Sequence, residues 1–307
     1  NGFPASTYRL ILQALRDAGH QVDAIECIGH DPNFPVSSNW PKLVDQLATT
    51  LPASNIDGGE ASWFRGKASW LIGHSLGGYL SMMCAAHLSR SQSQTIAGVI
   101  VLDAPIIGGW KARGLRLVKR SSLVGALLPG RLSRKRRRQW PDRAAVRLHF
   151  EHKRAFRHWD PRVLDDYVNF GTKDSRDRHG LPCRSLVFDR DIETLIYNTV
   201  PDHLGHYLKS YPINCPLVYI GGRQSFEARQ VGLASTHKLL SRLCQSDFIE
   251  TEGSRAKGTV LSSGGYDRFR EVPAAKIDLK AGMNRLLMRP EGALRQELAD
   301  VRAVRLV

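Results

Sequence analysis

Long apolar runs are missing from this sequence, and no signal segment is recognisable in it. No stretch approaches the roughly 18 apolar residues that a membrane-spanning helix needs. Cysteine is scarce, odd in number and free of CxxC spacing, which argues against a disulfide framework and a zinc site. The five residues are Cys27, Cys84, Cys183, Cys215 and Cys244. We therefore expect a protein of a reducing compartment, the cytoplasm, without a bound metal.

Acidic residues are outnumbered: 29 Asp and Glu stand against 44 Lys and Arg, so the formal net charge is +15. This charge predicts attraction to anionic partners such as acidic lipids, polyphosphates, nucleic acids or acidic small molecules. The excess is concentrated between Lys111 and Arg138, where eleven basic residues occur without a single Asp or Glu. Leucine and valine residues lie among these charges, and the pattern predicts a basic amphipathic helix.

Three interpretations of residues 111–138 remain open. The segment is a solvated helix, a docking site for an anionic membrane surface, or a means of steering an acidic substrate. Nucleic-acid binding is not expected, because no recognition motif accompanies the charge. Three nearby tryptophans, Trp110, Trp140 and Trp159, are expected to be buried core residues rather than stacking platforms.

The spacing of apolar residues predicts strands separated by helices, and therefore a doubly wound, mostly parallel sheet with helices on both faces. Asn39 is expected to cap a helix that has Pro41 in its first turn. We expect strands over residues 22–28, 68–73, 98–102, 216–220 and 247–250. We expect helices near residues 10–15 and over residues 39–51, 76–89 and 227–244.

This alternation is interrupted, which divides the chain into four parts. Residues 1–105 form the first part of an α/β core, and residues 213–253 form its second part. Residues 106–212 are rich in Arg, His and Trp and predict a mostly helical insertion. Residues 254–307 are a divergent tail, in which only the stretch after Pro290 has helical spacing.

The segment Gly73-His74-Ser75-Leu76-Gly77 matches the pattern G-x-S-x-G between a predicted strand and a predicted helix. A serine in that context occupies a strained turn, so the glycines around it leave room for the backbone. The turn directs the hydroxyl above the strand ends, and the helix that begins at Leu76 aims its amides and dipole there. A further glycine, Gly78, lets the helix pack closely on the sheet.

With this segment the chain resembles the α/β-hydrolase superfamily, in which the serine is the nucleophile. Asn1-Gly2-Phe3-Pro4 is similar to the family's HGFP-type loop, although Asn1 stands where a histidine is usual. The resemblance implies that the amide of Phe3 or Gly2 joins that of Leu76 in an oxyanion hole, and that residues 106–212 are a cap. It covers residues 1–253 and implies that three preceding strands are missing, so we expect a fragment or a truncated gene product.

A serine nucleophile needs a base, and the base needs an acid that orients it. The resemblance implies two candidates for the acid, Asp103 after one strand and Glu227 after the next. Asp103 directly ends a predicted strand, but an aspartate in that position can also be purely structural. The choice between the two acids stays open.

The base is missing from its expected place, because no histidine follows His237. Arg255 stands about where the family's histidine would be, and arginine does not act as a base near neutral pH. Three explanations compete. A histidine such as His203 or His206 substitutes, the protein is a non-catalytic member of the fold, or the sequence after about Gly253 is read in a shifted frame.

The function expected from these residues is hydrolysis of a carboxylic ester or a related acyl bond in a small-molecule substrate. Ser75 would attack the carbonyl carbon, and no cofactor is required. The alternative is a catalytically inactive protein of this fold that binds an anionic ligand or membrane through its basic insertion.

Overall fold

The computed structural model describes residues 2–51, 69–89, 96–120, 130–156, 159–222, 225, 231–244 and 246–250. Asn1, Glu227 and the divergent tail expected over residues 254–307 lie outside these ranges. Within the described ranges, no helix combines the length and the apolar character needed to cross a bilayer. The same ranges contain no group of three or more His, Cys, Asp or Glu residues arranged to hold a metal ion.

A four-stranded parallel sheet forms the centre of the fold, with the strand order β1-β2-β6-β7. The strands are β1 (Ser69–His74), β2 (Ile96–Leu102), β6 (Leu217–Gly221) and β7 (Ser246–Glu250). His74 pairs with Leu102, and Leu102 pairs with Ile220, so the strands end along one edge of the sheet. In open α/β sheets this carboxyl edge is where ligands bind.

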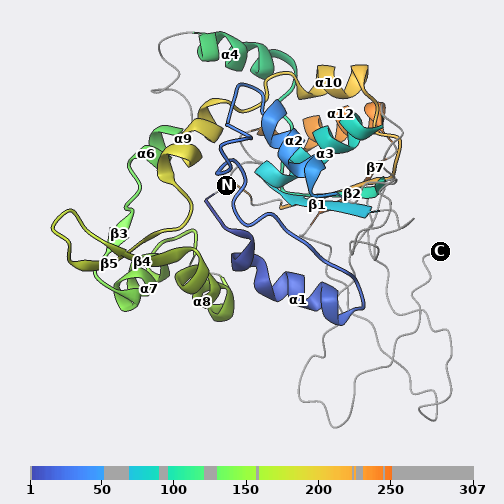
Figure 1. Ribbon diagram of the computed structural model, residues 1–307. Helices are drawn as coiled ribbons and strands as arrows, with labels where there is room; N and C mark the ends of the chain where they lie inside the picture. The colour runs from blue at the N-terminus through green and yellow to red at the C-terminus, as the bar shows by residue number, and fades with distance from the viewer. Residues whose placement is uncertain are drawn as a thin grey trace, which may run out of the picture.

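Helices lie on both faces of this sheet, as the sequence predicts for a doubly wound fold. Figure 1 shows α1 below the sheet, and α2, α3, α10 and α12 above it. The helices are α1 (Arg9–Asp17), which follows the 3-10 turn η1 (Ala5–Tyr8), and α2 (Pro41–Thr49), α3 (Leu76–Leu88), α10 (Leu204–Ser210) and α12 (Leu233–Leu243). Helix α3 is buried almost all round because it packs on β1, β2 and α2 at once.

The strand expected over residues 22–28 does not form; these residues are irregular. A strand requires a neighbour for its backbone hydrogen bonds, and no described segment pairs with the outer edge of β1. The segment and the residue after it are held instead by isolated hydrogen bonds. Ala5 N donates to Glu26 O at 3.0 Å, and Gly29 N donates to Gln46 Oε1 at 2.9 Å. On the outermost strand, β1, the side chains of Trp70 and Ile72 remain 50% and 47% exposed.

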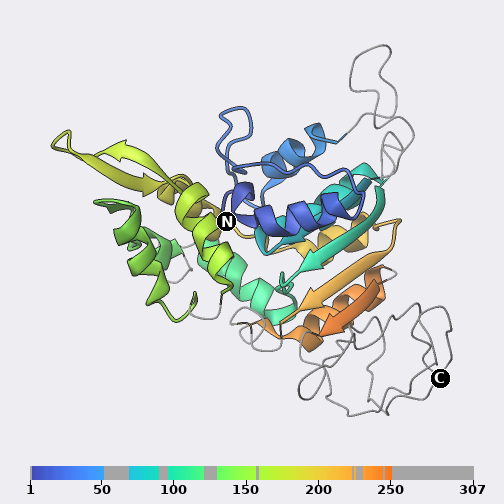
Figure 2. The same ribbon diagram turned by 90° about the horizontal axis from the view of Figure 1, so that it is seen from below.

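The inserted segment between β2 and β6 contains helices and a second sheet, so the expectation of a mostly helical insertion was incomplete. Its helices are α4 (Gly109–Arg120), α6 (Gly130–Arg134), α7 (Arg143–Glu151), α8 (Pro161–Phe170) and α9 (Arg190–Asn198), followed by α10. Its antiparallel sheet has the order β3-β5-β4, with β3 (Gln139–Trp140), β4 (Thr172–Arg176) and β5 (Pro182–Leu186). Figures 1 and 2 place this sheet, with α7 and α8, to one side of the central sheet.

The second sheet escaped prediction because its strands carry few apolar residues. The sequences of β4 and β5 are TKDSR and PCRSL, which have no apolar alternation. The buried Arg184 joins them, donating to Thr172 O at 2.6 Å and to Asp174 Oδ1 at 2.7 Å. Polar contacts therefore hold this hairpin together where apolar packing is usual.

A separate apolar cluster fills the insertion. It consists of Trp140, Val146, Phe150, Leu164, Tyr167 and Val168, with Phe3 and Trp159 packed against it. Trp140 is thus a core residue, as expected, and Trp159 is partly buried. The expectation for Trp110 was wrong, because this residue is 78% exposed on α4.

Candidate active site

Ser75 lies in a sharp turn between β1 and α3, in the left-handed half of backbone space at φ 52° and ψ −113°. Its amide donates to Leu102 O at 2.9 Å, so the end of β2 holds the turn in place. A non-glycine residue in this conformation carries strain of about 1–3 kcal/mol. The backbone geometry at Ser75 is the feature that the G-x-S-x-G pattern predicts.

Two of the three glycines around Ser75 are required by close contact. A Cβ at Gly73 would lie 2.1 Å from the carbonyl carbon and oxygen of Gly77, and one at Gly78 would lie 2.7 Å from Ala104 Cβ. A Cβ at Gly77 would meet nothing within 4 Å. The steric reason expected for these glycines therefore applies to Gly73 and Gly78 but not to Gly77, whose backbone faces Gly73.

The first amides of α3 lie directly after Ser75. Gly78 N and Tyr79 N donate to Ser75 O at 3.0 and 3.3 Å, and these bonds begin the helix. The amides of Leu76 and Gly77 precede them and have no acceptor within the helix. Together with the helix dipole, these amides form a positive end beside the serine, where negative charge is stabilised.

Asp103 occupies the matching position on the next strand. It directly follows β2, has φ 45°, and its amide donates to Ile220 O at 2.8 Å. One carboxylate oxygen, Oδ1, accepts a bond from Gly222 N at 3.3 Å. Because His74 pairs with Leu102, the residues that follow them, Ser75 and Asp103, lie at neighbouring strand ends. The other acid candidate, Glu227, is outside the described residues.

Among the described residues, no histidine hydrogen-bonds to Ser75 or to Asp103. The ring of His74, which precedes the serine, instead bonds to Tyr8 through Nδ1, at 2.9 Å from Tyr8 Oη. Burial raises the pKa of Tyr8 to about 12, so its phenol keeps its proton at neutral pH. His203 precedes α10, where its ring packs at 5.8 Å from that of Tyr207 and where burial lowers its pKa.

The expected oxyanion loop, Gly2-Phe3, lies against the insertion. Figures 1 and 2 both place the start of the chain beside the carboxyl edge of the central sheet. Gly2 has φ 75°, and a Cβ there would lie 2.7 Å from Glu193 Oε1. The Phe3 ring packs on Tyr167 and Trp159, with centroids 5.2 and 5.8 Å away. Sequence reasoning missed Glu193 and Tyr167, because neither belongs to a motif.

The basic segment, residues 111–138, splits into separate parts. Helix α4 confirms a helix in its first part, and α6 begins only at Gly130. Several of the charges are paired internally: Arg116 and Lys119 bind Asp202 at 3.2 and 2.8 Å, and Arg136 binds Glu193 at 3.0 Å. The exposed basic side chains in the described part of the segment are Arg113, Arg116, Arg134, Lys135, Arg137 and Arg138.

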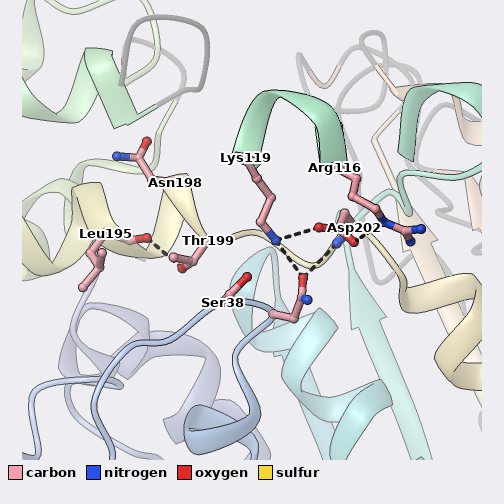
Figure 3. A pocket seen from close by; sticks show the side chains of 8 residues that line it. Ser38, Arg116, Lys119, Leu195, Asn198, Thr199 and Asp202 are labelled. Carbon is pink, nitrogen blue, oxygen red and sulfur yellow. Dashed lines mark hydrogen bonds and ion pairs between the residues drawn. The ribbon is translucent and has the colours of Figure 1, made fainter. Parts of the chain in front are cut away.

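A cavity of about 510 Å³ lies where α4 and α9 meet the residues before α2, as Figure 3 shows. Lys119 Nζ donates there to Asn39 Oδ1 and Asp202 Oδ2, both at 2.8 Å. The side chain of Asn39 thus binds α4 and does not cap α2 as predicted, although Pro41 occupies the first turn. The cavity is lined by Ser38, Asn39, Arg116, Lys119, Leu195, Asn198, Thr199 and Asp202, and so by none of the expected catalytic residues.

Known structures share this architecture. E-2-(acetamidomethylene)succinate hydrolase aligns with 16% identity and a TM-score of 0.53, over 81% of this chain and 80% of that one. The peroxisomal α/β-hydrolase Lpx1 of Saccharomyces cerevisiae aligns with 15% identity and a TM-score of 0.54, over 82% of this chain and 68% of that one. The thioesterase domain of the curacin biosynthetic pathway aligns with 17% identity and a TM-score of 0.52, over 81% of this chain and 80% of that one. At such identities these likenesses establish the fold alone.

The family of the chain is assigned from its sequence. No curated protein sequence matches the chain significantly. Residues 1–217, well over half of the 307, match the profile described as the alpha/beta hydrolase family. This match includes the sharp turn around Ser75 (residues 73–78, called the elbow below), Asp103 and the whole insertion. The chain therefore belongs to the alpha/beta hydrolase family.

Proposed function

We propose that this protein is a serine hydrolase that cleaves a carboxylic ester or a related acyl bond in a small-molecule substrate. The observation that carries the proposal is the backbone of Ser75, which lies at φ 52° in a turn that leaves no room for a side chain at Gly73 or Gly78. A strained serine at the carboxyl edge of a sheet is costly to maintain, and such strain is typical of functional sites. The hydrolase and thioesterase among the similar folds are consistent with this chemistry.

In the proposed reaction Ser75 Oγ bonds to the carbonyl carbon, and the carbonyl oxygen becomes negatively charged. The amides of Leu76 and of Phe3 or Gly2 stabilise that charge. The oxyanion collapses, the alcohol leaves with the proton taken from Ser75, and water then releases the acid from the acyl-enzyme. Asp103 is the described candidate for orienting the base, and the insertion is proposed to cap the site. Arg223, Gln224, residues 226–230 and residues 251–307, where the family places further catalytic groups, lie outside the described ranges.

A fluorophosphonate probe tests this proposal, because it bonds only to an activated serine. We expect the folded protein to be labelled at Ser75, and Ser75→Ala to abolish labelling. Ser175→Ala, on the insertion's β4, is the matched control and should leave labelling unchanged. Absence of labelling in the folded wild-type protein would reject the hydrolase function.

The second candidate function is binding of an anionic membrane without catalysis, and the outward face of α4 favours it. Trp110 and Leu117 are 78% and 69% exposed, and Arg113 lies between them. Spacings of three and four residues place all three on one side of the helix. The side chain of Lys119, on the other side, is only 9% exposed. This combination of an aromatic, an aliphatic and a basic side chain suits the boundary between lipid headgroups and acyl chains.

Vesicle co-sedimentation tests this second candidate. We expect binding to vesicles that contain phosphatidylserine and little binding to pure phosphatidylcholine. The double variant Trp110→Ala, Leu117→Ala should lose binding, while Leu148→Ala, Leu181→Ala, which removes apolar side chains exposed elsewhere on the insertion, should keep it. Equal binding by both variants, or none by the wild type, would reject docking through α4.

A further inference from the structure

The loop Gly2-Phe3 rests on an ion pair that belongs to the insertion. Arg136 Nη1 donates to both carboxylate oxygens of Glu193, at 3.0 and 3.1 Å. The other terminal nitrogen of Arg136 donates to the hydroxyl of Tyr167. A Cβ at Gly2 would lie 2.7 Å from Glu193 Oε1 and 2.9 Å from Arg136 Nη1, so the backbone of the loop touches the pair directly.

This ion pair is largely shielded from water, and its burial keeps the two side chains together. The side chain of Glu193 is 5% exposed and that of Arg136 is 16% exposed. A charge buried to this degree must keep its partner, because an unpaired one costs several kcal/mol. Glu193 lies on α9 and Arg136 lies two residues after α6, and these two helices are joined by a buried bond of 2.7 Å between the hydroxyls of Ser133 and Thr194. The side chains of Arg136 and Glu193 are therefore held in fixed positions under the loop, and the pair is called the platform below.

The other side of the loop is fixed by aromatic rings. Phe3 packs on Tyr167, whose hydroxyl is bound to Arg136. Tyr167 in turn packs edge-on against Phe150, with centroids 4.8 Å apart, inside the apolar cluster of the insertion. One residue, Tyr167, thus links the ion pair at Gly2 with the ring contacts at Phe3.

We infer that Arg136 and Glu193, linked through Tyr167, are positioning residues that hold the amides of Gly2 and Phe3 at the oxyanion of the reaction. This inference rests on the proposed function, in which those amides stabilise the charge. The pair acts through the loop and does not touch the reacting atoms. The insertion therefore supplies part of the geometry of the catalytic centre, in addition to covering it.

Two measurements test the inference on Glu193→Gln, which keeps the size of the side chain and removes its charge. The first is the kinetics of fluorophosphonate labelling at Ser75 over a series of probe concentrations. Because the loop stabilises charge as it develops, we expect the maximal labelling rate to fall about tenfold. The probe concentration that gives half of this rate should change little. A purely structural defect would instead lower the fraction of protein that is labelled.

The second measurement is hydrogen exchange of the backbone amides, followed by mass spectrometry of the peptide that contains residues 2–8. We expect exchange in this peptide to be faster in Glu193→Gln than in the wild type. Asp174→Asn is the control, since it removes the carboxylate charge that pairs with Arg184 between β4 and β5 of the insertion. This control should change neither measurement.

Tyr167→Phe provides a milder second variant in case Glu193→Gln does not fold. It removes the hydroxyl that Arg136 binds and keeps the ring against Phe3, so faster exchange in residues 2–8 is again expected. Unchanged exchange and unchanged labelling in a folded Glu193→Gln or Tyr167→Phe protein would overturn the inference. Failure of the wild-type protein to be labelled would reject the proposed hydrolase instead, and hydrogen exchange would still decide whether the pair holds the loop.

Discussion

Ser75 and Asp103 are equivalent residues on neighbouring strands. Each directly follows the last residue of its strand, and these last residues, His74 and Leu102, pair in the sheet. Each also has a positive φ, 52° for Ser75 and 45° for Asp103, which is unusual for a residue other than glycine. The two strands therefore turn sharply at the same level and leave a hydroxyl and a carboxylate at one edge.

Asp103→Asn is predicted to slow fluorophosphonate labelling of Ser75 by on the order of a hundredfold, because an orienting carboxylate fixes the base and stabilises its charged form. The amide side chain keeps the oxygen that accepts from Gly222 N, so the fold should persist. Asp45→Asn, which removes only an exposed pair with Lys42, is the control. Unchanged labelling in Asp103→Asn would assign Asp103 a structural role and leave Glu227 as the acid candidate.

Three histidines, His74, His203 and His206, offer a second prediction. His74→Gln, His203→Gln and His206→Gln should each label at a rate within about threefold of the wild type, because none of these rings bonds to Ser75. Labelling rates of the three folded variants check this. A loss of a hundredfold or more in any one of them would identify that ring as the base.

The elbow glycines should differ in their tolerance of alanine. Gly73→Ala should lower the free energy of unfolding by about 3 kcal/mol or more, because its Cβ would meet backbone atoms at 2.1 Å. Gly77→Ala is the matched substitution, with free space around its Cβ, and should change that free energy by less than about 1 kcal/mol. Urea unfolding measures both, and equal losses would contradict the described turn.

Asp202 makes the stability depend on pH. Burial alone would raise its pKa, but the hydrogen bonds and charges of Lys119 and Arg116 hold this pKa below the usual value. A carboxyl with a lowered pKa in the folded state stabilises the fold above its unfolded pKa of about 3.9. This contribution disappears as the pH falls through the lower, folded value.

Asp202→Asn should therefore lower the free energy of unfolding by about 3 kcal/mol at pH 7, since it leaves the buried Lys119 without its counter-charge. The difference between the variant and the wild type should shrink as the pH falls below about 4. Urea unfolding at pH 7, 5 and 3 checks both statements. A difference that stays constant or grows toward acid pH would reject this role for Asp202.

The features that could be predicted from the sequence are local ones. The elbow follows from Gly73, Ser75 and Gly78, because a tight turn admits few residue types. The first turn of α2 follows from Pro41, whose ring favours that position. These residues specify the structure of their own segment whatever surrounds it.

The features that escaped prediction depend on distant partners. Residues 22–28 have the composition of a strand but no described neighbour to pair with, and β4 and β5 pair through a buried Arg184 that resembles a surface residue in the sequence. Asn39 has the pattern of a helix cap, yet Lys119 binds its side chain. Glu193 belongs to no motif, and its role is visible only where Gly2 approaches it.

The contact between Gly2 and Glu193 also has a consequence for the timing of synthesis. Translation at roughly 5–20 residues per second separates these two residues by about ten to forty seconds. During that interval the elbow strand and its helix emerge from the ribosome, but the platform beneath the loop does not yet exist. A nascent chain that stops before Glu193 would thus carry Ser75 without this contact at Gly2, and under the proposed function its reactivity would come only with the later part of the chain.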